Sequence, residues 1–197
     1  ARMTPATTMG GDFYDYIELP DGRIGIVMAD VSGKGVPAAF FMAVSRTNLR
    51  ETARHHAEPG ACLARTNDVL CTQNPMDLFV TVFYCILDPH TGELRYANGG
   101  HNPPYILRAA GTVETLDGAG GLVLGVIPGI QYPDHTVQLQ RGDRLVLFTD
   151  GVTEAFNPAD EAYGVDRLID EIKAHGQGPS AALVERICGS IATFAGT

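Results

Sequence analysis

Two stretches of this chain end an apolar, strand-like run in an aspartate that leads directly into a turn of small residues. The first is RIGIVMADVSGKG, where the aspartate is Asp30, and the second is DRLVLFTDGVTEA, where it is Asp150. The segment GGDFYDY near the start adds Asp12 and Asp15. A carboxylate at a strand end is held by the sheet yet open to solvent, which suits a hard cation that prefers oxygen ligands. A single such aspartate commonly just starts a turn, but three such sites in one short chain favour metal binding.

The chemistry open to these carboxylates is metal-assisted attack of water on a phosphoryl group. Two Mg²⁺ or Mn²⁺ ions about 3.5 to 4 Å apart activate a bridging water and clamp a phosphoryl oxygen. Such a pair needs one shared carboxylate and flanking ones, so we predict Asp30 as the bridge and Asp12 and Asp150 beside it. Close carboxylates raise one another's pKa unless a cation neutralises them. The spacing alone does not prove that a metal is bound.

The elements that must position these aspartates are strands interrupted by helices. A β-hairpin is predicted over residues 11–30 around a Pro-Asp-Gly turn, with Asp30 continuing an apolar face. Helical spacing predicts a pair of helices over 36–56 and 59–74. Further strands are expected at 78–87, 93–100, 105–108, 112–116, 134–140 and 144–150, a glycine-rich mobile loop at 117–129, and two helices at the end. This order is typical of an α+β layered sandwich.

Composition limits the classes of function. The chain has 197 residues, 45% hydrophobic, which is enough for one globular domain with a substantial core. A net charge of -9 without a run of Lys or Arg argues against nucleic acid or an anionic membrane as the main partner. The longest apolar stretch, 78–87, is too short to span a bilayer, and no secretory leader precedes it. We therefore expect a cytoplasmic protein with no direct membrane insertion.

The four cysteines do not form a recognisable site. Cys62, Cys71, Cys85 and Cys188 have neither the CxxC spacing of zinc and redox sites nor the density of a secreted scaffold. Each has apolar neighbours in the sequence. We predict reduced cysteines that serve in packing.

Five ordered motifs together resemble a known family. GGDFYDY, ADVSGKGVPAAFFM, YANGGHNPPY, LGV and LVLFTDGVTEA resemble the metal-dependent serine/threonine phosphatases of the PPM type, over about residues 5–175. The branch they resemble most is that of the bacterial sporulation and sigma-factor regulatory phosphatases, such as stage II sporulation protein E. The resemblance implies a four-layer αββα sandwich, in which two antiparallel sheets are flanked by helical pairs. It also implies a pair of Mn²⁺ or Mg²⁺ ions at one edge.

The resemblance also implies roles for individual residues. Asp30 resembles the carboxylate that bridges both metals, and the carbonyl of Val31 resembles the backbone ligand beside it. Asp150 resembles a direct ligand of one ion, and Asp12 resembles the carboxylate that supports the other ion or its waters. Asp15 either touches a metal or its water, or is a polar strand residue.

Two departures from the family pattern affect these roles. Eukaryotic relatives have a histidine two positions after the bridging aspartate, where this chain has Ser32, so a metal-bound water would have to protonate the leaving group. The family also ends in a strand with an Asp-Asp motif that binds metal, whereas this sequence stops at Thr197. We accordingly expect residues 1–197 to be a single phosphatase domain, the C-terminal output domain of a longer protein, with one ligand missing.

The other chemistry-bearing residues have less specific interpretations. The segment SGKG lacks the phosphate-loop pattern, so Lys34 is either near a substrate phosphate or a solvated turn residue. His101 in NGGHNPP is better explained as a capped turn histidine than as a ligand.

The resemblance implies a metal-dependent hydrolase of phosphoserine or phosphothreonine on a regulatory protein of the anti-sigma-factor antagonist type. An upstream sensor domain and a homodimer are further expected partners, and the helical hairpin over 36–74 could transmit their signal, with Arg46 and Arg50 on its outer face. The alternative function is a weak pseudo-phosphatase that acts as a binding or dimerisation module in signalling. The missing last ligand supports that alternative.

Overall fold

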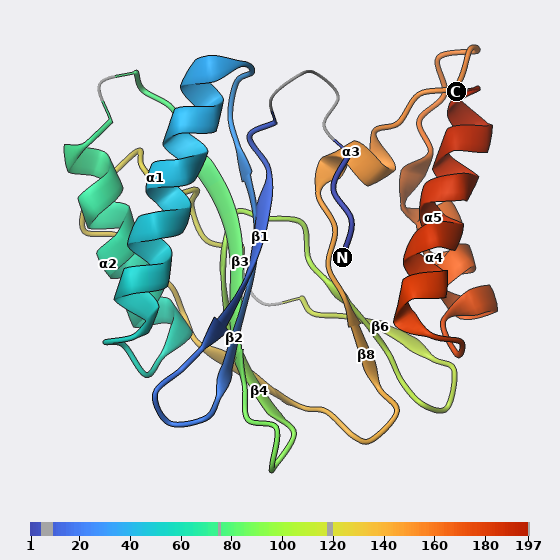
Figure 1. Cartoon of the computed structure of the whole chain (residues 1–197), viewed down its shortest axis with the longest axis horizontal. Coiled ribbons are helices and arrows are strands. Elements are labelled where there is room, and N and C mark those ends of the chain that lie inside the picture. The colour runs from blue at the N-terminus through green and yellow to red at the C-terminus, as the bar shows by residue number, and fades with distance from the viewer. Residues whose placement is uncertain (5–9, 75, 118–119, 197) are drawn as a thin grey trace. The chain divides into compact units, whose positions relative to one another are not determined.

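The computed structural model describes residues 1–4, 10–74, 76–117 and 120–196 of the chain (Figure 1). Residue contacts divide the chain into two compact units. The N-terminal unit comprises residues 4–103 and 117–139, and the C-terminal unit comprises 1–3, 104–116 and 140–197. Within the described ranges, no helix combines the length and the apolar character needed to cross a membrane.

The N-terminal unit is a five-stranded antiparallel sheet covered on one face by two helices (Figure 1). The strand order is β1-β2-β3-β4-β7. The helices α1 and α2 pack against each other and against the strands. The bounds of these elements are β1 Phe13–Glu18, β2 Ile24–Val31, α1 Val36–Ala53, α2 Pro59–Thr72, β3 Val80–Leu87, β4 Glu93–Gly99 and β7 His135–Gln138.

The alternating pattern of β2 explains how this sheet is built. Val27, Ala29 and Val31 are almost completely buried and join Phe41 and Leu49 of α1 in one apolar cluster. Successive side chains of a strand point to opposite faces, so the residues between them, including Asp30, lie on the face away from the helices. The sheet therefore separates a helix-covered core face from the face that carries Asp30.

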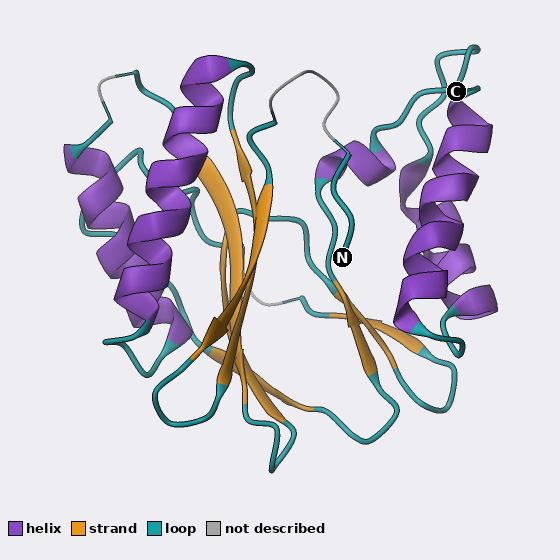
Figure 2. Ribbon diagram, in the orientation of Figure 1, coloured by secondary structure: helices purple, strands orange, loops and turns teal. Residues whose placement is uncertain are grey.

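The C-terminal unit contains a three-stranded antiparallel sheet in the order β6-β5-β8 and three helices (Figure 2). Its elements are β5 Tyr105–Leu107, β6 Val113–Thr115, β8 Arg144–Val146, α3 Asp150–Thr153, α4 Gly164–His175 and α5 Ser180–Ala195. Leu168 and Ile172 of α4 and Leu183 of α5 pack with Leu107 of the sheet in one buried cluster. The buried residues of the two longer helices thus pack against the strands.

The expected α+β class with two antiparallel sheets is confirmed, while one expected strand is shorter than predicted. The run 144–150 was expected to be a strand that ends in Asp150, but β8 ends at Val146 and Asp150 is the first residue of α3. Thr149 occupies the N-cap position in extended backbone, a position that threonine favours before a helix. Asp150 therefore lies at a helix start rather than at a strand end.

The glycine-rich segment, expected as a mobile loop, is anchored where the structure describes it. Residues 118 and 119 lie outside the described residues. Asn67 of α2 donates from Nδ2 to the Ile127 carbonyl at 2.8 Å and accepts from the Gly125 amide at 2.9 Å. Leu124 is completely buried, and its backbone exchanges two hydrogen bonds with the backbone of Val80.

All four cysteines are free, as predicted. Cys62 and Cys85 are buried, whereas Cys71 and Cys188 are half-buried. Burial raises the pKa of the Cys62 thiol to about 12 and raises that of Cys85 as well. Thiols with raised pKa values are poor nucleophiles, so these two are packing residues.

Candidate metal site

Asp30 and Val31 lie at the end of β2, where the strand passes into a glycine turn. Val31 is 2% exposed and contributes its side chain to the core, while Asp30 is half-buried on the opposite face. Gly33 and Gly35 have φ values of 85° and 76°, in the left-handed region that favours glycine. Helix α1 begins directly afterwards, with Pro37 in its first turn. The tight turn therefore fixes the backbone that follows Asp30.

Gly11 brings the segment that precedes β1 against the carbonyl of Val31. A Cβ atom at Gly11 would lie 2.8 Å from the Val31 oxygen and 3.1 Å from the Val31 Cβ. Such contacts are closer than side chains tolerate, so only glycine permits this approach. The register of β1 with β2 ends with Phe13 opposite Ala29, so Asp12 and Asp30 are the next residues of their two segments. The structure thus places Gly11 against Val31, while Asp12, Asp30 and Val31 as metal ligands stay a prediction.

The oxygen donors of this cluster fit a hard divalent cation. Two carboxylates and one backbone carbonyl are the ligand types that Mg²⁺ and Mn²⁺ accept, and Mg²⁺ keeps several waters. No group of three or more His, Cys, Asp or Glu that could hold a metal occurs among the described residues. Water and the Val31 carbonyl would therefore have to complete the coordination.

Asp150 belongs to the C-terminal unit. It is half-buried, and its backbone carbonyl accepts from the Glu154 amide at 2.7 Å and from Thr153 Oγ1 at 3.2 Å. Asp150 is the first residue of α3 and therefore lies at the N-terminus of this helix. Its role as a metal ligand stays a prediction.

Asp15 lies on the helix-covered face of β1 and is tied to α1. It is 8% exposed, and its carboxylate pairs with Arg50 at 2.7 Å and with Arg46 at 3.2 Å. Burial alone would raise the pKa of Asp15, but the hydrogen bonds and charges of the two arginines outweigh it and hold the pKa below its ordinary value. Of the two readings of Asp15, the strand residue is correct, and the contact with metal is wrong because the side chain faces the helices.

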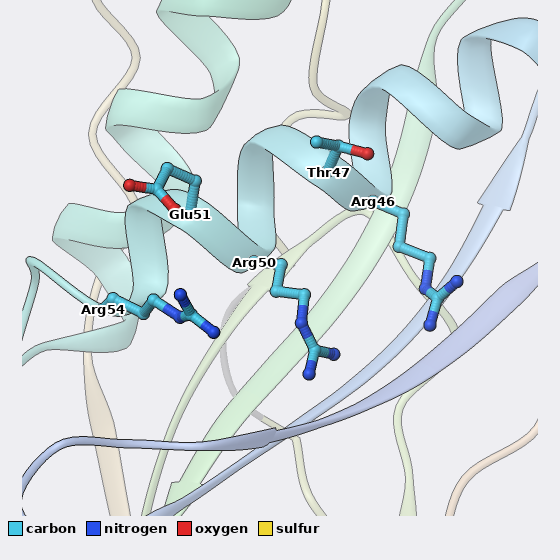
Figure 3. Close-up of a pocket in the computed structure, with 5 residues that line it drawn as sticks. All are labelled: Arg46, Thr47, Arg50, Glu51 and Arg54. Atoms are coloured by element: carbon cyan, nitrogen blue, oxygen red, sulfur yellow. The ribbon is translucent and has the colours of Figure 1, made fainter.

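Helical spacing gathers three arginines that are scattered in the sequence. Figure 3 shows Arg46 and Arg50 of α1 and Arg54 directly after it, which line a pocket of about 350 Å³ with Thr47 and Glu51. Two of these guanidinium groups were expected on the outer face of the hairpin, but they point to β1 and hold Asp15. They therefore anchor the helix to the sheet.

His101 lies in the capped turn that the sequence favoured, and the two alternatives for Lys34 stay open. His101 is 5% exposed in a turn closed by Asn98, whose Oδ1 accepts from the His101 amide at 2.7 Å. Asn98 Nδ2 donates to the His101 carbonyl at 2.9 Å. Lys34 is exposed in the turn after β2.

Sequence reasoning missed Thr81, which lies beside Asp30 on β3. The register pairs these two residues, and Thr81 Oγ1 lies 2.8 Å from His101 Nδ1. Ser32, in the position of the histidine of eukaryotic relatives, accepts a hydrogen bond from the Phe79 amide at 2.9 Å. The sequence signal was the single polar residue, Thr81, in the apolar run LFVTVFYCIL, and the structure pairs it with the end of β2.

Solved structures define the class of this fold. The PP2C domain of SiaA from Pseudomonas aeruginosa matches 98% of this chain and 77% of its own with a TM-score of 0.86, at 22% identity. The catalytic domain of PstP, solved with two manganese ions, matches 97% of this chain and 88% of its own with a TM-score of 0.68, at 13% identity. The chain thus has the fold of the PP2C-type, or PPM, phosphatases.

Sequence comparison narrows the class to one branch. The model of the stage II sporulation protein E (SpoIIE) family matches residues 20–197, and the chain belongs to this family. Protein IcfG of Synechocystis is 31% identical over 89% of this chain and 32% of its own length. Phosphoserine phosphatase RsbU of Bacillus subtilis is 36% identical over 78% of this chain and 46% of its own length. The chain therefore spans a third to a half of these relatives, and the predicted resemblance is confirmed.

Proposed function

We propose that this chain is a metal-dependent protein serine/threonine phosphatase domain. The observation that carries the proposal is the close approach of Gly11 to the Val31 carbonyl, because Asp12 and Asp30 are the chain neighbours of these two residues. Asp12, Asp30 and the Val31 carbonyl would hold Mn²⁺ or Mg²⁺ ions, and the sequence resemblance adds Asp150 as a further ligand. Relatives of the fold support this choice, since PstP was solved with two manganese ions and RsbX with magnesium.

The bound ions would supply a water of lowered pKa as nucleophile and would stabilise the negative charge that develops on the phosphoryl group. The chain's own contribution is to hold the ligand oxygens in place before the substrate arrives. Asp30 is paired with Thr81 of β3, and the glycine turn fixes the backbone after it. The hydroxyl of Ser32 does not ionise near neutral pH, so residue 32 does not replace a histidine as proton donor.

We further propose the substrate and the setting. RsbU is a phosphoserine phosphatase, which supports phosphoserine or phosphothreonine on a regulatory protein of the anti-sigma-factor antagonist type. The relatives extend over at least twice the matched length, which supports an output domain fused to a sensor. A homodimer through the helical hairpin is part of the same proposal.

One observation favours a second function, that of a binding or dimerisation module with weak activity. Within the described ranges, no group of three or more His, Cys, Asp or Glu side chains could hold a metal ion. A domain that binds ions weakly could retain its partner surfaces and lose turnover.

Release of phosphate from a phosphoserine peptide distinguishes the two functions. Asp30→Asn should lower Mn²⁺-dependent turnover by more than about 100-fold, because even partners that only orient metal ligands are worth 10- to 100-fold. The matched control is Asp21→Asn, an exposed aspartate in the turn that precedes the other end of β2. The chain and the natural protein that contains it should be assayed side by side. Activity that is absent from both, with several phosphorylated substrates, would establish the binding module instead.

A further inference from the structure

A buried polar network stands next to the predicted bridging aspartate. Thr81 of β3 is the cross-strand partner of Asp30. Its Oγ1 lies 3.4 Å from the Asp30 carbonyl oxygen and 2.8 Å from His101 Nδ1. Directly opposed residues of an antiparallel pair have their Cβ atoms about 5 Å apart on the same face. Thr81 therefore lies on the face of the sheet that carries the Asp30 carboxylate.

His101 is held in place from the other side. Asn98, itself 2% exposed, forms two hydrogen bonds with the backbone of His101. Gly100 between them has a φ of 75°, which closes the turn, and the Asn98 carbonyl accepts from the Gly121 amide at 2.9 Å. The imidazole thus approaches Thr81 from a rigid turn rather than from a free loop.

The donors and acceptors of this network run in one direction. A threonine hydroxyl has a single proton but can also accept. If His101 Nδ1–H donates to Thr81, the hydroxyl proton is left for the carbonyl of Asp30, and both contacts are satisfied. We assign this tautomer from the network. The order of donation is then His101 to Thr81 to Asp30.

We propose that Thr81 is a positioning residue for the metal site and that His101 acts through it. The hydroxyl fixes the peptide between Asp30 and Val31, and this peptide joins the two residues whose oxygens are the predicted ligands. The role rests on the proposed function, since it has meaning only if Asp30 and Val31 bind metal. It differs from catalysis because neither side chain is required to touch the substrate.

The test compares Thr81→Val, which removes the hydroxyl and keeps the branched shape, with Thr81→Ser, which keeps the hydroxyl. Mn²⁺ binding is measured by titration calorimetry without substrate, together with KM and kcat in saturating Mn²⁺. Thr81→Val should weaken Mn²⁺ binding about 10-fold with KM unchanged, while Thr81→Ser stays close to the parent chain. Thr136→Val on the exposed face of β7 is the control for a threonine of the same sheet.

His101→Phe tests the second half of the network. If His101 acts through Thr81, the double variant should bind Mn²⁺ no more weakly than Thr81→Val alone. Independent losses that multiply in the double variant would overturn the link between the two residues.

The outcomes separate this role from the proposed function. Mn²⁺ binding that needs Asp30 but is the same in folded Thr81→Val as in the parent chain would overturn the positioning role alone. An equal loss in Thr81→Ser would overturn it too, because the hydroxyl would not be the group that matters. A parent chain that binds no Mn²⁺, alone or in the natural protein, would overturn the metal site and this role with it.

Discussion

Adding one methyl group at Gly11 should displace a ligand oxygen of the metal site. The new Cβ would lie 2.8 Å from the Val31 carbonyl oxygen, whereas ordinary contacts begin at 3.4 Å. The difference between these two distances is 0.6 Å, which the two backbones must share. Metal sites tolerate deviations of only about 0.2 Å in ligand distance. The Val31 carbonyl would therefore leave its coordinating position even if β1 absorbed half of the shift.

The fold should tolerate Gly11→Ala better than the site does. Overpacking of this kind typically costs about 1 to 3 kcal/mol in the free energy of unfolding. Gly11 precedes β1, so the hydrogen-bonded ladder from Phe13 onwards can be kept. We expect a lower melting temperature, an intact far-ultraviolet circular dichroism spectrum and at least about a 10-fold loss of Mn²⁺ affinity.

The assay is Mn²⁺ titration calorimetry alongside thermal unfolding. Gly189→Ala in α5 is the control, because a Cβ there would meet nothing within 4 Å. Parent-like Mn²⁺ affinity in Gly11→Ala would refute the reasoning and remove Val31 from the predicted ligands.

Two further predictions concern contacts that hold the N-terminal unit together. Arg50→Ala should destabilise the protein by about 1 kcal/mol at pH 7, since Asp15 keeps Arg46 as a partner. Because the folded pKa of Asp15 is lowered, this contribution is present above its unfolded pKa of about 3.8 and is lost as the pH falls through the lower folded pKa, so the urea unfolding curves of the two proteins should converge only below about pH 3.8. Asn67→Ala should lower the free energy of unfolding by about 1 to 3 kcal/mol, because the Gly125 amide and the Ile127 carbonyl lose this partner. Hydrogen exchange at the Gly125 amide should accelerate more than at the Val27 amide. Equal protection of the Gly125 amide in the parent chain and in Asn67→Ala would contradict the anchoring role.

Local patterns predicted much of the fold because they repeat along the chain. The alternation in β2 indicated both the strand and the face of Asp30, and the same alternation in FYDYIE places Asp15 with Phe13 and Ile17 on the buried face. This alternation was visible in the sequence and indicated that Asp15 lies on the face opposite to that of Asp30. The arginines that pair with Asp15 lie 31 and 35 residues away, at a separation no local pattern reports.

The remaining differences have the same physical origin. The apolar run before Asp150 predicted a strand that ends there, yet β8 ends at Val146 and Asp150 is the first residue of α3. Glycine content suggested a mobile segment over 117–129, but Asn67 anchors the described part through side-chain bonds across about 60 residues. The network of Thr81 and His101 likewise depends on two strands meeting in register. Tertiary partners decided the last two cases, whereas the case of Asp150 was decided by a local helix start.

The position of Val31 links the evolution of the core to that of the site. Its side chain is packed in the cluster beneath α1, while its carbonyl is a predicted ligand on the same residue. A substitution that repacks α1 over β2 would move this peptide even though the carboxylate of Asp30 is unchanged. Thermostable variants selected with substitutions in this core should therefore often have altered metal affinity. Among natural variants, stability and activity would change together.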